Sequence, residues 1–403
     1  MKTEKKNIVI IGAGYGGITA GLRAARLLRK LSDYQIHLID KNPYHTLKTQ
    51  LHEAAVRRTR VTIPIDRIIQ HRNILFHIEE VDKVDPVNCT VHMGKTVLSF
   101  SYLVLAIGGQ ANFYGITGLK EFAFPLQSFQ DAQRIYDHIT QLCNMASAEK
   151  NEEQRKDLLR FVIGGGGLSG VEFASELADY IVKNTHDCHI PLDEIEIVIV
   201  ESEKRLVPYM KESFAETIKR KLSEKNVKVI TGTKIINQTP ENVFFSTGEV
   251  LKTRTLIWTG GISISGLMKE SGLKRGQSGR VIVDKFLRID GFPLIYAIGD
   301  NALAINPETG NPVPAAAQFA LQQGRLAANN IYAEITGKEK TNYRPKVIGE
   351  VVSLGRHLAV GWLALPLLKK FTFAGFVGSL LKAAVKEKHI MLLRKESRNW
   401  VKY

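Results

Sequence analysis

The hydrophobic residues near the start of the chain form two short runs with an amphipathic stretch between them. Residues 7–11 and residues 35–39 are continuous apolar runs, and apolar positions recur at helical spacing from Ala20 to Leu28. Continuous runs are typical of parallel strands that are buried on both faces. The pattern therefore predicts a strand–helix–strand unit whose second strand ends at Asp40.

The same order of patterns returns further along the chain. An apolar run at residues 160–163 leads into the glycine-rich residues 164–170, and a helical pattern follows through Leu177. A second apolar run, residues 194–200, then ends at Glu201. This repeat predicts two units of the same topology, and hence a doubly wound α/β fold.

Other runs complete the expected architecture. Residues 102–109 and 255–261 each pair a strand pattern with two glycines, and residues 294–300 form a strand pattern that stops at a Gly-Asp pair. Residues 144–156 are polar and helix-prone, which favours a surface connector ahead of the second unit. We therefore expect two Rossmann-like domains, the second inserted in the first, followed by a C-terminal segment.

The first glycine cluster has the spacing Gly-x-Gly-x-x-Gly at Gly12, Gly14 and Gly17. Between a strand and a helix, such glycines allow a tight turn, close approach of a pyrophosphate, and close packing of helix on strand. The N–H groups and partial positive charge of the helix N-terminus attract the phosphates. Asp40, at the end of the next strand, can accept hydrogen bonds from ribose hydroxyls. A dinucleotide site is predicted here.

The second cluster repeats these features at Gly165, Gly167 and Gly170, with Glu201 in the place of the ribose-binding acid. A carboxylate there favours NAD over NADP because it repels a 2′-phosphate. The nearby cations of Lys204 and Arg205 weaken that preference. The chain is therefore expected to bind two dinucleotides.

The net positive charge of the chain is concentrated near its C-terminal end. The 403 residues include 44% hydrophobic and 24% charged residues, which is ordinary for a globular chain of two or three domains. Lys and Arg number 55 against 40 Asp and Glu, and nine of these basic residues lie in residues 361–403 among Phe, Leu and Val. A basic amphipathic segment indicates an anionic membrane surface in preference to nucleic acid.

Neither a signal peptide nor an apolar stretch of spanning length is found in the sequence, so we expect a peripheral protein on the cytoplasmic face of the membrane. Cys89, Cys143 and Cys188 are widely separated and form no paired motif, which predicts neither a metal site nor a disulfide scaffold.

Two dinucleotide folds with a late Gly-Asp pair resemble the two-dinucleotide-binding-domain flavoproteins. The cysteine pair that disulfide reductases carry early in the first domain is missing from residues 42–53, and no cysteine occupies the flavin-side positions of sulfide:quinone oxidoreductases. The chain most resembles the type II NADH:quinone oxidoreductases. The most specific matching segment is residues 317–324, read as AQxAxQxG, supported by residues 164–172 and Trp258 to Gly261.

This resemblance implies bound FAD and NAD(H), a membrane quinone as acceptor, and roles for single residues. Glu172 and Gln318 are the expected catalytic residues, and Gln318 with Gln322 would contact the quinone. The expected cofactor-binding residues are Gly12, Ala13, Gly14, Tyr15, Gly16, Gly17, Asp40, Lys41, Val81, Gly108, Asp300, Ala317, Gln318 and Lys369 for FAD, with Gly165, Gly167, Gly170 and Glu201 for NAD(H).

The expected division of the chain is an FAD domain at 1–117, an NAD(H) domain at 118–264, the second part of the FAD domain at 265–340, and a membrane and quinone-access region at 341–403. The basic residues of that region, Lys369, Lys370, Lys382, Lys386 and Lys388 among them, are expected on the membrane side. A homodimer is one assembly that the resemblance allows. Two alternatives stay open: a flavoprotein with a sulfide, thiol or soluble quinone acceptor, and a non-catalytic protein that responds to nucleotides.

Overall fold

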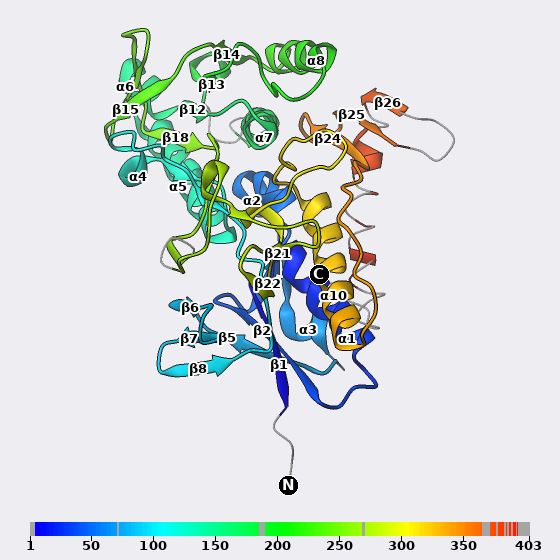
Figure 1. Ribbon diagram of the computed structural model, residues 1–403. Helices are drawn as coiled ribbons and strands as arrows, with labels where there is room; N and C mark the ends of the chain where they lie inside the picture. Colours follow the sequence, from blue (N-terminus) through cyan, green and yellow to red (C-terminus); the bar gives the residue numbers. More distant parts are fainter. Residues whose placement is uncertain are drawn as a thin grey trace.

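The computed structural model describes residues 5–70, 72–184, 190–267, 271–364, 371–375 and 378–382, with positions 384, 387, 390, 391 and 393. Two α/β units are stacked along the long axis of Figure 1, one built around the start of the chain and one around residues 119–258. The expected α/β class with two doubly wound units is confirmed.

The first unit is organised by a six-stranded sheet in the order β21-β22-β9-β1-β2-β5. β1 pairs in parallel with β2 and β9, and β22 joins β9 from much later in the sequence. The first sheet therefore combines strands that precede the second unit in the sequence with two strands, β21 and β22, that follow it. Its strands are β1 (Lys6–Ile11), β2 (Tyr34–Asp40), β5 (Ile74–Ile78), β9 (Tyr102–Leu105), β21 (Arg288–Ile289) and β22 (Phe292–Ala297).

The second unit has a five-stranded parallel sheet in the order β11-β18-β12-β13-β14. Its central strands are fully buried, as their continuous apolar runs predict. The strands are β11 (Phe124–Pro125), β12 (Arg160–Gly164), β13 (Glu196–Glu201), β14 (Val227–Thr231) and β18 (Thr255–Trp258).

Several smaller sheets of two or three strands are attached to the two units. A two-stranded antiparallel contact, β10 (Gln110–Ala111) with β19 (Ile262–Ser263), joins the two chain crossings between the units. The last three-stranded sheet, β24 (Gly349–Ser353), β25 (Ala359–Leu363) and β26 (Phe371–Gly375), lies against the second unit. The others are β3 (Tyr44–Thr46) with β4 (Thr62–Pro64), β6 (Lys83–Asp85) with β7 (Thr90–Met93) and β8 (Thr96–Ser99), β15 (Ile235–Gln238) with β16 (Asn242–Phe245) and β17 (Val250–Lys252), and β20 (Val281–Ile282) with β23 (Ala302–Leu303).

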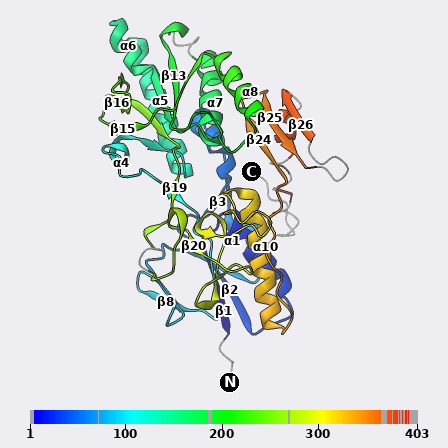
Figure 2. The same cartoon turned by 45° about the horizontal axis from the view of Figure 1, so that its top comes forward.

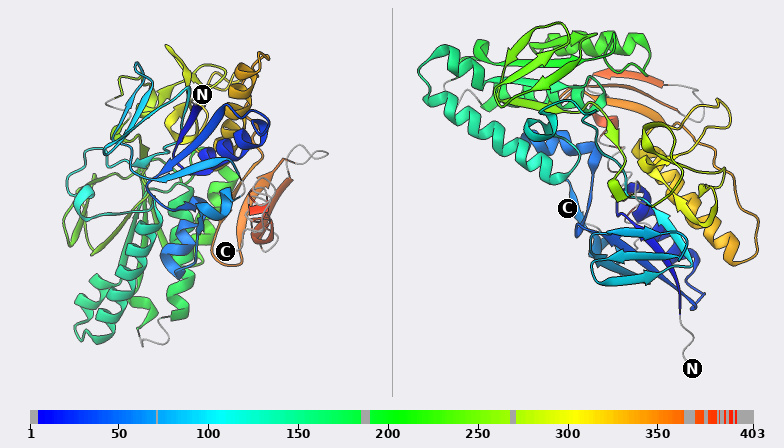
Figure 3. Two further views of the ribbon diagram at one scale, coloured as in Figure 1. Left: turned by 90° about the horizontal axis from the view of Figure 1, so that it is seen from below. Right: turned by 60° about the vertical axis from the view of Figure 1, so that its left-hand side comes forward.

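The helices cover the sheets and meet between the units. α1 and α10 lie side by side on the first unit (Figures 1 and 2), where a Cβ on Gly324 would overlap the main chain at Gly16. α5 runs along the outside of the second unit (Figure 3). The helices are α1 (Tyr15–Leu27), α2 (Leu51–Arg57), α3 (Ile65–Ile69), α4 (Leu119–Phe122), α5 (Phe129–Ala148), α6 (Glu152–Leu158), α7 (Leu168–Asn184), α8 (Glu212–Ser223) and α10 (Ala317–Ile335), with 3-10 turns η1 (Lys48–Gln50), η2 (Leu192–Glu194), η3 (Gln277–Gly279) and η4 (Gly299–Asn301).

Three expected boundaries differ from the observed ones. The strand expected from residue 194 begins at Glu196, because Glu194 ends a 3-10 turn and its carboxylate binds the guanidinium of Arg155. The connector at residues 144–156 consists of the end of α5 and most of α6. After residue 370 the chain forms strand β26 before helical positions begin at residue 378, so this part of the amphipathic segment is a strand.

None of the helices within the described residues has both the length and the apolar character needed to cross a bilayer.

A pair of stacked histidines lies between β2 and β5. His37 Nδ1 is 2.9 Å from His77 Nε2, and His37 Nε2 is 3.2 Å from Asn7 Oδ1. Burial, together with the smaller effect of the neighbouring His77, lowers the pKa of His37 to about 4. Both imidazoles are therefore neutral in the folded protein near neutral pH.

This pair predicts a loss of stability in acid. Between pH 6.5 and pH 4 the unfolded chain binds a proton at His37 that the folded chain does not, so the free energy of unfolding falls as the pH is lowered. In His37→Gln, the fall between pH 7 and pH 4.5 should shrink by about 1–2 kcal/mol, measured by urea unfolding. His357→Gln, at an exposed site, is the control. An unchanged pH dependence in His37→Gln would contradict the assignment.

Candidate functional site

The two glycine turns have the same geometry. Gly12 and Gly165 have positive φ angles of 99° and 112°, which only glycine adopts readily. A Cβ on Gly17 would overlap the carbonyl oxygen of Gly12, and one on Gly170 would overlap that of Gly165. The first and third glycines of each motif are thus required by the protein's own main chain.

The middle glycine of each motif is different. A Cβ built on Gly14 or Gly167 would meet no protein atom within 4 Å. Gly14 begins α1 as its N-cap residue with an extended φ of −72°, a conformation open to other residues. Nothing within the described protein therefore requires glycine at these two positions, whereas a pyrophosphate lying against the helix N-terminus would. The turns fit the dinucleotides that the sequence predicts.

The two expected ribose-binding acids also occupy equivalent positions. Asp40 Oδ2 accepts the N–H of Ala13 at 2.7 Å, and its Oδ1 accepts that of Asn42 at 2.8 Å. Glu201 Oε2 accepts the N–H of Gly166 at 2.6 Å, and its Oε1 accepts that of Glu203 at 2.8 Å. Each carboxylate thus connects the glycine turn to the end of the neighbouring strand.

The remaining residues expected around FAD come together at the end of the first sheet. Gln323 Oε1 accepts the N–H of Gly299 at 2.6 Å, which ties the turn carrying Asp300 to α10. Asn301 Oδ1 accepts the N–H of Gly108 at 3.2 Å. The first turn of α10 (Ala317–Ile335) lies against the start of α1, where a Cβ on Gly16 would be 3.4 Å from Ala320 O.

One edge of this site is formed by the residues that follow β2 and β5 in the sequence. Glu79 donates its N–H to Asp40 O at 3.2 Å, so the end of β5 lies beside the acid. There Lys41 forms an exposed ion pair with Glu80 at 3.2 Å, next to the partly buried Val81. Lys369 lies outside the described residues.

On the second turn, the cations that follow Glu201 differ in their surroundings. Arg205 donates through Nη2 to the carbonyl oxygens of Pro208 at 2.7 Å and Met210 at 3.0 Å, within its own loop. This loop bonds to the glycine turn through the Val207 N–H and Gly166 O at 2.9 Å. The guanidinium is therefore held by main-chain acceptors, and of the two cations that follow Glu201, Lys204 is the one left to face a 2′-phosphate.

Glu172 lies where the two units and the C-terminal region meet. Its Oε1 accepts hydrogen bonds from the N–H of Ser353 at 3.0 Å and from the ammonium group of Lys382 at 2.9 Å. His52 Nδ1, from α2, is 3.6 Å from its Oε2, and Lys382 Nζ lies 3.2 Å from His52 Nε2. One carboxylate on α7 thus contacts residues from three separate parts of the chain.

The charges around Glu172 are balanced by burial and pairing. Burial lowers the pKa of His52 far below its usual value, and the cation of Lys382 lowers it further, so His52 is neutral. One turn along α7, burial raises the pKa of Glu176 to about 7, although it pairs with Arg57 of α2. The carboxylates of α7 therefore face cations from other segments.

Gln318 and Gln322 lie on α10, four residues apart, and both bind main chain. Gln318 accepts the N–H of Ile348 at 2.9 Å and donates to Gly349 O at 3.2 Å. Gln322 accepts the N–H of Lys346 at 2.9 Å and donates to the oxygen of the same residue at 2.8 Å. Their expected contact with a quinone stays a prediction.

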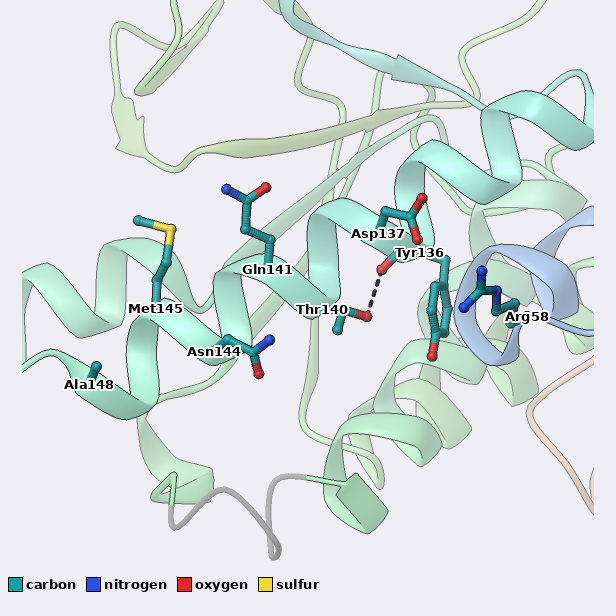
Figure 4. Close-up of a pocket in the computed structure, with 8 residues that line it drawn as sticks. All are labelled: Arg58, Tyr136, Asp137, Thr140, Gln141, Asn144, Met145 and Ala148. Carbon is teal, nitrogen blue, oxygen red and sulfur yellow. Dashed lines mark hydrogen bonds between the residues drawn. The ribbon is translucent and has the colours of Figure 1, made fainter.

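A separate groove lies on the outer surface along α5, away from these residues (Figure 4). The guanidinium of Arg58 lies over the ring of Tyr136, 5.6 Å from its centroid, and Thr140 donates to Tyr136 O at 2.8 Å. None of the expected site residues lines this groove.

Sequence reasoning missed or misplaced several residues. The membrane-side position expected for Lys382 is wrong, because its ammonium group binds Glu172 and His52. His52 has no motif of its own, and the Ser353 N–H is a main-chain group that no side-chain pattern reveals. Gln323 occupies an unspecified position of the AQxAxQxG segment, so the motif gives it no signal, and only the fold shows that it holds Gly299.

Comparisons with known proteins agree with this geometry. The model of a family described as pyridine nucleotide-disulphide oxidoreductase matches residues 6–324. The type II NADH:quinone oxidoreductase of Staphylococcus epidermidis is 30% identical over 372 residues, which cover 90% of this chain and 90% of that protein. The Staphylococcus saprophyticus protein of the same name is 29% identical with the same coverage.

Among solved structures, NDH2 from Plasmodium falciparum in complex with NADH is similar with a TM-score of 0.84. The match covers 98% of this chain and 96% of that chain at 20% sequence identity. At this identity, the structural similarity bears on the fold alone.

The open space at Gly14 predicts a clean separation of folding from cofactor binding. Gly14→Val should fold, because a Cβ at this position meets no protein atom within 4 Å, but it should retain less than about a tenth of the parent's FAD after gel filtration. Flavin absorbance and thermal unfolding would be measured together. Gly266→Val is a control at an exposed glycine after β19 that is also open and has no positive φ. Stoichiometric flavin in Gly14→Val would argue against this site.

Proposed function

The chain belongs to the pyridine nucleotide-disulphide oxidoreductase family and, within it, to the type II NADH:quinone oxidoreductases, and we propose that it transfers a hydride from NADH to bound FAD and then electrons to a membrane quinone without pumping protons. The observation that carries this proposal is the place of Glu172. It lies on α7, the helix that follows the second glycine turn, one residue beyond the first turn, and it contacts His52 of the first unit.

Each of the two glycine turns would bind a different nucleotide. Gly12, Gly14 and Gly17 with Asp40 would hold FAD, and the turn at Asp300 with the N-terminus of α10 would support its remaining part. Gly165, Gly167, Gly170 and Glu201 would hold NAD(H). When bound, FAD supplies the chemistry that accepts a hydride and passes electrons onward.

The residues at the junction supply orientation and charge. Lys382 and the Ser353 N–H fix one oxygen of Glu172, so the carboxylate keeps a defined position at the junction. From there Glu172 would act beside the nicotinamide and flavin rings. Gln318 would donate a hydrogen bond to a quinone oxygen, and Gln322 would line the same face of α10. The reaction takes up one proton for each NADH and quinone consumed.

We further propose that the enzyme prefers NADH. Glu201 is tied to the glycine turn by its own hydrogen bonds and is 8% exposed, so it cannot readily move away from a 2′-phosphate. Arg205 is committed to carbonyl oxygens of its own loop. The balance of charge at this site therefore disfavours NADPH.

The proposal also includes peripheral attachment to the cytoplasmic face of the membrane. A quinone resides in the bilayer, so the enzyme must reach its surface. Support comes from the basic and apolar composition of residues 361–403, and from exposed apolar side chains at Phe371, Leu380 and Met391. Assembly as a homodimer is a further possibility that sedimentation would test.

The two half-reactions test the central proposal. In anaerobic stopped-flow measurements, NADH should bleach the flavin absorbance of the parent enzyme, and a soluble quinone analogue should restore it. Glu172→Gln should alter the flavin–nicotinamide charge-transfer band or its decay. Gln318→Met should spare the reduction by NADH and slow the reoxidation by quinone about tenfold or more.

Asn329→Ala, on α10 but bonded to Arg23, is the matched control for Gln318→Met. If Gln318→Met slows both half-reactions equally, Gln318 has a structural role. If NADH leaves the flavin of the parent oxidised, the proposed reaction is wrong. A parent that is reoxidised by sulfur compounds but not by quinones would favour the alternative acceptor.

Membrane attachment is tested by co-sedimentation with phosphatidylglycerol vesicles. The combined change of Lys370, Lys386 and Lys388 to Gln should weaken binding at least tenfold at low salt, and less at high salt because salt screens exposed charges. Phe371→Ser should weaken binding at both salt concentrations. The control changes three exposed lysines elsewhere, Lys95, Lys150 and Lys234, to Gln. Unchanged sedimentation of the first two variants would contradict the attachment.

A further inference from the structure

Three side-chain amides of α10 bind a single extended segment of main chain, residues 341–349. Asn330 accepts the N–H of Thr341 at 2.9 Å and donates to its oxygen at 3.0 Å. Gln322 does the same with Lys346, at 2.9 and 2.8 Å. Gln318 accepts the N–H of Ile348 at 2.9 Å and donates to Gly349 O at 3.2 Å. The segment is thus held along the helix by paired hydrogen bonds.

These hydrogen bonds hold the part of the segment nearest Gln318 more than side-chain burial does. The side chains of Val347 and Ile348 are 44% and 47% exposed, and Lys346 is exposed as well. The N–H groups of Lys346 and Ile348, in contrast, face the amides of α10, and Ile348 O accepts the N–H of Ala364 at 2.8 Å. This part of the segment therefore offers main-chain groups to the helix while its side chains face outward.

The pairing determines which way round the Gln318 amide lies. The oxygen and nitrogen of an amide have nearly the same shape, and their positions are assigned from their hydrogen-bond partners. An N–H from Ile348 can face only the oxygen of Gln318, and the carbonyl of Gly349 can face only its nitrogen. In a flipped amide, the NH2 group would face the N–H of Ile348, and the amide oxygen would face the carbonyl oxygen of Gly349.

The same amide keeps half of its hydrogen-bonding capacity. A glutamine amide has two N–H donors and an oxygen with two lone pairs, and the main chain uses one donor and one lone pair. The second N–H of Gln318 is on the same nitrogen that Gly349 fixes. Within the described residues it has no partner, so it can bind another acceptor without breaking either main-chain bond.

We propose that the main chain at Ile348 and Gly349 positions Gln318, so that this glutamine presents a fixed N–H donor to the electron acceptor. The proposal rests on the proposed function, in which Gln318 faces the quinone. The Ile348 N–H does not touch the acceptor and acts through Gln318. Gln322 and Asn330 keep the segment in register, so that the donor needs no reorientation when the acceptor binds.

A proline at position 348 removes the orienting N–H and leaves Gln318 unchanged. In anaerobic stopped-flow measurements, Ile348→Pro should reduce the rate of flavin reoxidation by a soluble quinone about threefold to tenfold, the size expected from one hydrogen bond. Reduction by NADH should keep the parent rate. Reoxidation by ferricyanide, which takes one electron at a time and needs no hydrogen-bond donor, should also keep the parent rate.

Val347→Pro is the matched control. In the described part of the chain, no hydrogen bond is found for the Val347 N–H, and the side chain is similarly exposed. Val347→Pro should therefore leave reoxidation by quinone near the parent rate. Equal slowing in Val347→Pro and Ile348→Pro would mean that any disturbance of the segment has this effect, and would overturn the proposal.

A double-mutant cycle tests whether the effect passes through Gln318. Adding Ile348→Pro to Gln318→Met should cause no further slowing, since the oriented amide is already gone. A further slowing by the same factor as in the parent would overturn the proposal. These outcomes leave the proposed function intact, because that function fails only if the parent flavin is not reduced by NADH or not reoxidised by quinone.

Hydrogen exchange gives an independent measurement in a variant that keeps the natural main chain. In Gln318→Met, the amide of Ile348 should exchange at least tenfold faster than in the parent, while that of Lys346 keeps its protection through Gln322. Unchanged protection of Ile348 would overturn the proposal, even if Ile348→Pro cannot be purified with its flavin.

Discussion

A carboxylate that binds the main chain of a glycine turn is the constraint on which both expected nucleotide sites depend. The turn at Gly12 must bend with a positive φ and leave the helix N-terminus open, so its N–H groups cannot all be satisfied within the helix. Asp40 accepts one of these N–H groups, from Ala13, and thereby connects β1 to β2 beyond their last ladder bond. Glu201 does the same for Gly166 in the second unit. The expected ribose-binding acid of each unit is thus also a structural residue.

The duplicated turns place two nucleotides, but they do not by themselves bring them together. The two units are joined by α2 and α7, which pack against each other at the junction and carry His52 and Glu172. A carboxylate buried between two units needs compensation, and Lys382 and the Ser353 N–H supply it from the end of the chain. The junction is therefore completed only when the last quarter of the chain has folded onto the first two units.

The sequence predicts the repeated parts of this molecule well and the unique parts poorly. Buried parallel strands and Gly-x-Gly-x-x-Gly turns have local patterns, so both sheets and both sets of glycines could be read from the residues. Glu172 and Gln318 could be read only through resemblance to a family. Lys382 was misplaced because a lysine among apolar residues has the same pattern whether it faces a membrane or a buried carboxylate. The partners of Gln318 cannot be predicted from the sequence, since main-chain groups are present at every residue and have no sequence signal.

The positions of Asp179 and Gly355 show that the C-terminal sheet belongs to the core of the site. Asp179, two turns after Glu172 on α7, accepts the N–H of Arg356 at 3.0 Å and pairs with Lys225. Gly355 has a positive φ of 91°, and a Cβ there would overlap the Asp179 carboxylate. The β24–β25 turn is therefore fitted to α7 at two points, Ser353 on Glu172 and Arg356 on Asp179. A surface anchor would not need such contacts. Because the same strand β24 begins at Gly349, which holds Gln318, one sheet sets the positions of both expected catalytic side chains.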